Sequence, residues 1–364
     1  MRLLRLQVRD FRNLAEVDLE PSARTTILVG ENGQGKTNLL EAIFVVAALR
    51  SFRTSKLAEL VAFGQGEAKL GARVLKDELV RVYEVDLAPG SRKVRLDGKA
   101  VRPLARYFGA FNVVVFTPED LALPRGAPGD RRKFLDRGVF NLESSYLATA
   151  TDYDKVLRTR NSVLRQAAQG TLGGRQVDEL LAVYDAQLAR YAVDIIAARA
   201  RFLETLGPEL SAAFAAITRT GLVARAAYAS RLLGETAAGI EAQLRAGRAR
   251  DLACQSTQLG PHRDDVRLEL DGREAGSFAS QGQLRAIMLA WKTAELTVLG
   301  RVHGDLPILL LDDVSSELDP TRNEYLFEHL ARLAGQCFIT TTHASHVLLH
   351  RERADYRIAS GQIS

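Results

Sequence analysis

The chain contains little cysteine and no long apolar run. Among its 364 residues only Cys254 and Cys337 are cysteines, and their spacing is not that of a metal site. This scarcity argues against a disulfide-rich secreted scaffold and favours a reduced, cytoplasmic protein. No run of 18 apolar residues occurs, so we expect no membrane span and no membrane partner.

The first residues also lack the unbroken apolar segment of a signal peptide. In MRLLRLQVRDFRNL, Leu4, Leu6 and Val8 alternate with polar residues, which predicts a strand. Hydrophobic residues make up 46% of the chain and charged residues 26%, as in ordinary globular proteins. The net charge of +5 is compatible with nucleic acid and equally with an ordinary basic surface, and both interpretations stay open.

The two ends of the chain have an alternating strand and helix pattern. Thr25–Val29 and the apolar run before Asp312 predict buried strands, and Lys36–Leu49 predicts a helix. QCFITTTH at 336–343 predicts another strand. Between 71 and 101 the chain alternates strongly, with Asp97-Gly98 as a hairpin turn. We therefore expect a parallel sheet built from both termini, with the middle of the chain inserted.

The middle of the chain, from about 145 to 253, is rich in Ala, Leu, Arg and Glu and poor in strand-forming residues. Apolar residues recur there with spacings of 4 and 3 from Val177 to Phe202, which is a heptad pattern. TLGGRQ at 171–176 separates this helix from the one before it. The pattern predicts a short antiparallel helical arm, and an amphipathic helix packed on its own lobe fits equally well.

Residues Gly30–Thr37, GENGQGKT, fit the phosphate-loop motif G-x-x-x-x-G-K-[ST], with a strand before and a helix after. Its glycines let the backbone N–H groups turn toward phosphate oxygens at a helix N-terminus. We expect Lys36 to bridge the β- and γ-phosphates of ATP and the Thr37 hydroxyl to ligate Mg²⁺. The nucleotide-binding candidates in this loop are Gly30, Glu31, Asn32, Gly33, Gln34, Gly35, Lys36 and Thr37.

Carboxylates follow the apolar strand that ends at Leu311. Asp312 is expected to hold Mg²⁺ beside the phosphate loop, and Asp313 to orient or deprotonate the attacking water. A turn-forming aspartate pair is the alternative for these two residues. His343 closes the next apolar strand, where it is either a structural histidine or a contact to the γ-phosphate. Asp312, Asp313, His343 and Lys36 are thus the catalytic candidates.

These motifs, in this order, resemble an ABC-type ATPase. Ser280–Gln283 resembles the signature motif, and Ser316–Asp319 the D-loop. The resemblance assigns Ser280, Gly282 and Gln283 to the γ-phosphate of ATP bound by a second copy. It also implies that Glu119 occupies the position of the Q-loop glutamine and contacts metal or water, whereas the alternative is a residue in a helix's first turn. Asp313 stands where many members have glutamate.

Further segments narrow the resemblance to the RecF family. They are LRLQVRDFRNL near the start, ENGQGKTNLLEAI, RSFRT at 50–54, VVVFTPEDLALPRGAPGDRRKFLDR at 113–137, QLGPHRDD at 258–265, SQGQLR and LLLDDVSSELD. The resemblance implies an α/β fold: an ABC-type P-loop ATPase head with an antiparallel β subdomain and an inserted helical lobe bearing a short helical arm. We expect lobe I at 1–115 and 290–364 and lobe II at 116–289. The resemblance also places Arg12 and Asn13 near the nucleotide. The alternative is that they are ordinary polar residues at the end of a strand.

The resemblance implies an ATP-dependent protein of DNA replication and recombinational repair. It implies binding to double- and single-stranded DNA at gap junctions, an ATP-dependent homodimer, weak DNA-stimulated ATPase activity, and cooperation with the RecR and RecO proteins. A nucleotide-gated scaffold and a transporter-type ABC ATPase subunit are the alternatives. Candidate DNA contacts are three basic clusters, each of which is otherwise a solvated face. They are Arg50, Arg53 and Lys56; Arg131, Arg132 and Lys133; and Arg245, Arg248 and Arg250.

Overall fold

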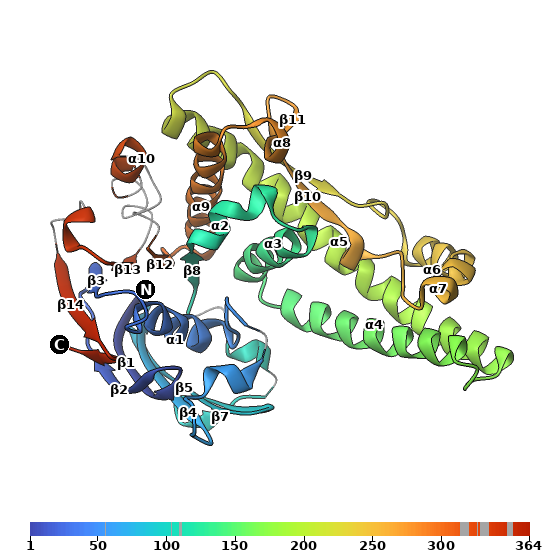
Figure 1. Ribbon diagram of the computed structural model, residues 1–364, viewed down its shortest axis with the longest axis horizontal. Helices are drawn as coiled ribbons and strands as arrows, with labels where there is room; N and C mark the ends of the chain where they lie inside the picture. Colours follow the sequence, from blue (N-terminus) through green and yellow to red (C-terminus); the bar gives the residue numbers. More distant parts are fainter. Residues whose placement is uncertain are drawn as a thin grey trace. The chain divides into compact units, whose positions relative to one another are not determined.

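The computed structural model describes residues 1–54, 56–102, 104–108, 111–313, 320–325, 327, 335–347 and 352–364. The chain divides into two units, each with its own interior (Figure 1). Unit 1 comprises Met1–Ala122, Ala212–Gly221 and Gln281–Ser364, and unit 2 comprises Leu123–Ser211 and Leu222–Ser280. The first change of unit, after Ala122, lies seven residues beyond the lobe boundary expected after 115. The change after Ser280 lies nine residues before the boundary expected after 289. The expected boundaries themselves stay a prediction.

A mainly parallel sheet occupies unit 1 and joins the two ends of the chain. Its strand order is β15(Gln362–Ile363)-β14(Arg353–Ala359)-β3(Thr25–Val29)-β13(Gln336–Thr341)-β12(Ile308–Asp312)-β8(Val113–Phe116). All adjacent pairs are parallel except β14 with β15. Every residue of β8, β12 and β13 is buried, as the apolar runs of β8 and β12 predict, and in β13 the burial includes Gln336, Thr340 and Thr341. The parallel sheet expected from the two termini is confirmed.

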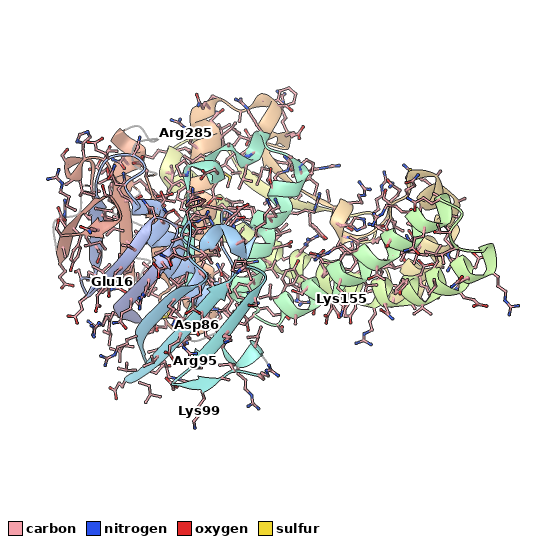
Figure 2. The ribbon with its side chains drawn as sticks, turned by 60° about the horizontal axis from the view of Figure 1, so that its bottom comes forward. Glu16, Asp86, Arg95, Lys99, Lys155 and Arg285 are labelled. Carbon is pink, nitrogen blue, oxygen red and sulfur yellow. The ribbon has the colours of Figure 1, made fainter. Side chains whose placement is uncertain are left out.

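An antiparallel sheet forms the rest of the strand framework of unit 1. Its order is β2(Leu14–Leu19)-β1(Arg2–Phe11)-β4(Ala68–Lys76)-β5(Leu79–Ala88)-β6(Ser91–Leu96)-β7(Lys99–Ala100). Asp97 and Gly98 both have positive φ, which the predicted two-residue hairpin turn requires. On the solvent side, Arg95 of β6 forms ion pairs with Glu84 and Asp86 of β5 (Figure 2). The predicted antiparallel β subdomain is confirmed.

Helix α1 (Lys36–Ala48) contacts strands of both sheets, and eleven of its thirteen residues are buried. A helix that is apolar around its whole circumference belongs in an interior, so the sequence KTNLLEAIFVVAA suits this position. The other described helices of unit 1 are α2 (Pro118–Ala122), α9 (Gln281–His303) and α10 (Pro320–Tyr325). α10 starts at Pro320, whereas the D-loop candidate Ser316–Asp319 lies outside the described residues.

Unit 2 is mainly helical. Its helices are α3 (Pro128–Leu142), α4 (Tyr146–Ala168), α5 (Gly174–Thr218, whose last residues belong to unit 1), α6 (Ala237–Ala246), α7 (Arg248–Cys254) and α8 (Ala275–Phe278). Val163 and Leu164 of α4 pack against Val177 and Leu181 of α5, on either side of the glycine turn. The predicted helical arm is confirmed.

The mainly helical middle contains one strand that its sequence does not predict. Strand β9 (Ala224–Ala229) lies within it and pairs with β10 (Asp265–Leu270), which pairs with β11 (Arg273–Glu274). The sequence ARAAYA has little intrinsic strand preference. Its conformation comes from the ladder that β10 offers, which is a contact between segments far apart in sequence. Among the described residues, no helix is long and apolar enough to span a bilayer.

Candidate nucleotide-binding site

The loop Gly30–Thr37 connects β3 to α1, and its glycines are required by its geometry. Gly33 and Gly35 have φ values of 80° and 114°, a region that favours glycine. Gly30 adopts an ordinary φ, but a Cβ there would lie 2.3 Å from the Ile358 carbonyl oxygen of β14. The start of the loop therefore lies tightly against β14.

Lys36 folds back over this loop. Its Nζ donates hydrogen bonds to the carbonyl oxygens of Gly30, at 2.5 Å, and Glu31, at 2.9 Å. Burial lowers the pKa of its ammonium group, and the carboxylates of Asp313, Asp312 and Glu31 oppose that shift. A buried ammonium group in a loop at a helix N-terminus is well placed to neutralise a phosphate.

Asp312, at the end of β12, receives two hydroxyl hydrogen bonds on one oxygen. Thr37 Oγ1 and Thr340 Oγ1 each donate to Asp312 Oδ1 at 2.8 Å. Burial raises the pKa of Asp312, and the nearby acids Glu119 and Asp313 add to the effect. The structure thus joins the phosphate loop to the end of β12 through two of the three residues expected to hold Mg²⁺.

Asp313 has a φ of 49°, and its backbone N–H donates to Thr340 Oγ1 at 2.9 Å. The left-handed conformation is one that Asp and Asn adopt more readily than most residues. Glu119 is exposed in the first turn of α2. Glu119, Asp312 and Asp313 line, with the phosphate loop, one cavity of about 320 Å³. The predicted metal, water and phosphate residues therefore converge.

Arg53 also lines this cavity, and the sequence did not single it out for nucleotide binding. Its Nη1 donates to Asn38 Oδ1 at 2.8 Å and lies 3.4 Å from Glu41 Oε2. Asn38 and Glu41 belong to α1, so the arginine is held against the helix that carries the phosphate loop. In the sequence, Arg53 was noted only within the RSFRT segment and as a member of a basic cluster that was a candidate for DNA contact.

Arg12 and Asn13, in the turn between β1 and β2, take different positions. Arg12 donates to Glu41 through Nε, at 3.0 Å, and Nη2, at 2.8 Å. Asn13 Nδ2 donates to the Gly33 carbonyl oxygen at 3.2 Å, and its Oδ1 accepts from Asn38 at 2.7 Å. Asn13 therefore supports the phosphate loop, while Arg12 neutralises a carboxylate of α1. Their contact with nucleotide stays a prediction.

The C-terminal hairpin of β14 and β15 holds the phosphate loop from another side. Ser360 N–H donates to Gln34 Oε1 at 2.6 Å, and Gly361 N–H donates to the Gln34 carbonyl oxygen at 2.9 Å. A Cβ on Gly361 would lie 2.1 Å from the Asn13 carbonyl oxygen. Sequence reasoning missed this brace, since it joins residues more than 320 positions apart.

The remaining candidates lie at the ends of other elements. Ser280 is exposed and immediately precedes α9, and Gly282 and Gln283 are half-buried in the first turn of that helix. The predicted helix start is therefore present. His343 is exposed and follows β13, and its backbone N–H donates to Thr341 Oγ1 at 3.2 Å. The contacts of these four residues with nucleotide stay predictions.

Residues 2–361 match the family model described as RecF/RecN/SMC N terminal domain. DNA replication and repair protein RecF of Myxococcus xanthus is 45% identical over 359 residues, covering 95% of this chain and 92% of that protein. The protein of that name from Citrifermentans bemidjiense is 38% identical over 371 residues, covering 100% of each.

Solved structures also show similarity to RecF. The structure of the recombination mediator protein RecF-ATPrS in the RecFOR pathway has a TM-score of 0.88 and 32% identity, covering 100% of this chain and 97% of that one. An Smc head domain from Pyrococcus furiosus, at 15% identity and a TM-score of 0.53, covering 100% of this chain and 95% of that one, shares the fold alone. The chain therefore has the fold of an ABC-type ATPase head.

Proposed function

The chain belongs to the RecF family of DNA replication and repair proteins, and we propose that it is an ATP-dependent DNA-binding protein of recombinational repair. The observation that carries the nucleotide part is the hydrogen bond between Thr37 and Asp312 inside one cavity with Lys36. The chain is similar over nearly its full length to proteins described as DNA replication and repair proteins, and this supports the proposal that it binds DNA.

ATP and Mg²⁺ are the ligands whose chemistry suits the cavity. The loop offers backbone N–H groups and the Lys36 ammonium to phosphates. Thr37 and Asp312 supply hard oxygen donors, which Mg²⁺ prefers, and both would hold the ion, with Glu119 on the cavity wall. When bound, the ion would neutralise phosphate charge. Asp313 would accept a proton from the attacking water, and His343 would contact the γ-phosphate.

The cycle that we propose needs two copies of the chain. The α9 start at Ser280, Gly282 and Gln283 would contact ATP held by the phosphate loop of a second copy, so ATP would hold the dimer together. Slow, DNA-stimulated hydrolysis would then release it. The dimer would bind double- and single-stranded DNA at gap junctions in the cytoplasm and would help to load recombinase with RecO and RecR. The description of a relative as a recombination mediator in the RecFOR pathway supports this assignment.

DNA binding to a gapped duplex, with and without ATP and Mg²⁺, tests this proposal. Wild type should bind more tightly with ATP, and Lys36→Ala should lose that increase because its phosphate loop lacks the cation. Lys155 is an exposed residue of α4 (Figure 2), and Lys155→Ala is the matched lysine control, which should behave as wild type. DNA affinity that is identical with and without ATP would contradict nucleotide control. A transporter-type subunit would show no DNA binding at low salt.

A further inference from the structure

The basic clusters that are contiguous in sequence are largely neutralised in the structure. At least two members of each cluster form ion pairs with acidic side chains. The pairs are Arg53 with Glu41, Lys56 with Glu59, Arg131 with Asp265, Lys133 with Asp130, Arg245 with Glu241, and Arg248 with Asp185. In the third cluster, Arg250 takes part in none of these ion pairs. The surface most suited to phosphate therefore has to be sought elsewhere.

A groove in unit 2 brings together arginines that are dispersed in sequence. It has a volume of about 640 Å³ and lies over β9 and β10. Ala227 and Ala229, two small residues of β9, form part of its lining, and Arg267 of β10 is paired in register with Ala227. Arg231, just after β9, and Arg250, on α7, line the same groove. Small side chains between long cationic ones leave a hollow with positive walls.

These arginines are available for a ligand. Arg231, Arg250 and Arg267 are exposed, and none of their side chains forms an ion pair or hydrogen bond within the described part of the chain. A fourth arginine of the groove, Arg263, is exposed and donates only to a backbone carbonyl oxygen, that of Thr257, at 3.3 Å. An arginine fork with no carboxylate partner suits a phosphate.

The acidic residues of the groove are mostly engaged. Asp264 accepts a 2.5 Å hydrogen bond from the Tyr228 hydroxyl, and Asp265 is paired with Arg131 at 2.6 Å. Glu269 is the third acid in the lining, and it is half-buried. The lining has four arginines and three acids, and one of these acids is paired with Arg131 outside the lining, so the groove carries a positive excess that attracts a polyanion.

We propose that this groove, through Arg231, Arg250 and Arg267, binds backbone phosphates of duplex DNA. The inference rests on the proposed function and names a surface that serves it. Single-strand grooves stack bases on aromatic rings, and Tyr228, the aromatic residue of this lining, has its hydroxyl held by Asp264. Charge without a stacking platform suits the regular phosphates of a duplex, whose bases stay paired.

The test compares a triple variant, Arg231→Ala, Arg250→Ala and Arg267→Ala, with wild type on a duplex oligonucleotide over a range of salt concentrations. The slope of log affinity against log salt should become shallower by about 3, since each lost phosphate contact removes about 1. The matching triple substitution by lysine should keep most of the slope because it keeps the charge. ATP affinity and thermal unfolding should stay unchanged and show that the variant is folded.

A second triple variant controls for net charge: Lys155→Ala, Arg165→Ala and Arg190→Ala, exposed residues of α4 and α5. It removes the same charge and should keep the wild-type slope. If the groove variant binds duplex with the wild-type slope, the assignment of DNA binding to this groove is overturned, while the proposed function still stands. An equal loss in the control variant, or a larger loss on single strands than on duplex, would also overturn it. Wild type that binds no DNA at low salt would refute the proposed function itself.

Discussion

The hydroxyl of Thr37, at the start of α1, donates a 2.8 Å hydrogen bond to the carboxylate of Asp312, at the end of β12. The two residues are 275 positions apart in sequence. β3 and β12 both flank β13 in the parallel sheet, so the loop after β3 lies close to the carboxyl end of β12. Asp312 is 7% exposed, which makes its negative charge costly without a cation.

We expect Asp312→Asn to stabilise the nucleotide-free protein while weakening Mg²⁺-dependent ATP binding. Asparagine keeps an oxygen for the hydroxyls of Thr37 and Thr340 but removes the buried charge. The melting temperature at neutral pH should rise, by the equivalent of about 1 kcal/mol in unfolding free energy. Calorimetry without nucleotide and ATP titration with and without Mg²⁺ measure the two effects. A lower melting temperature in the variant would refute the inference that the buried charge of Asp312 destabilises the nucleotide-free protein.

The pH dependence of this difference has a definite sign. Burial raises the pKa of Asp312 in the folded state, so the folded state binds the proton more tightly than the unfolded state does. The wild type therefore carries the full penalty above its raised pKa and loses it as pH falls toward the ordinary value near 3.8. The stability gap between Asp312→Asn and wild type should narrow over that window. A gap that widens on acidification would contradict the assignment.

Asp313→Asn should slow ATP hydrolysis and leave ATP binding intact. Because Asn also adopts the left-handed conformation that Asp313 has, the backbone should keep its path. Loss of a general base slows a reaction by about 10²- to 10⁴-fold, and single-turnover assays measure this. Asp313→Glu keeps a carboxylate and serves as the comparison. Wild-type hydrolysis in Asp313→Asn would contradict the proton-accepting role proposed for Asp313.

Gly361→Ala should disturb the phosphate loop from the opposite end of the chain. The added Cβ would lie 2.1 Å from the Asn13 carbonyl oxygen, and Gly361 N–H is bonded to Gln34. We expect a stability loss of about 1–3 kcal/mol and weaker ATP binding, measured by thermal unfolding and titration. Gly64→Ala is the control, because Gly64 has a similar φ of 82° and nothing within 4 Å of the added atom. An equal effect of both substitutions would assign the loss to backbone strain alone.

The sequence predicted those parts of the site that local motifs specify. Gly30–Thr37 has a fixed spacing between a strand and a helix, and the apolar run before Asp312 marks a buried strand end. Arg53 and Gly361 escaped prediction because their contacts depend on the three-dimensional path of distant segments. β9 escaped for the same reason, since its alanines gain strand structure from β10. Charge patterns misled most, because acidic side chains pair with these basic residues, and two of the partners, Asp265 and Asp185, are far away in sequence.

Arg12→Ala should destabilise the protein strongly. Glu41 is fully buried, and its carboxylate receives two hydrogen bonds from Arg12. Removing one partner of a buried pair costs about 3–5 kcal/mol, and the remaining contacts to Ser51 and Arg53 favour the lower end. Urea unfolding measures the loss. Arg5→Ala, which breaks an exposed pair with Asp18, is the control and should change stability little.

Ser280→Arg tests the assembly that the start of α9 predicts. Ser280 is exposed immediately before that helix, and the phosphate loop lies at the start of another helix, α1. If the N-terminus of α9 meets ATP held by a second copy, a bulky cation there should block closure of the dimer. ATP binding to the monomer should stay within a few-fold of wild type, while light scattering should detect no ATP-dependent dimer.

Ser91→Arg, on an exposed residue of β6, adds the same side chain to the antiparallel sheet and serves as the control. It should dimerise with ATP as wild type does. Hydrolysis by Ser280→Arg should also stop responding to protein concentration, since each nucleotide would lack the residues that a second copy supplies. A Ser280→Arg protein that still forms an ATP-dependent dimer would remove the reason for assigning Ser280, Gly282 and Gln283 to the nucleotide.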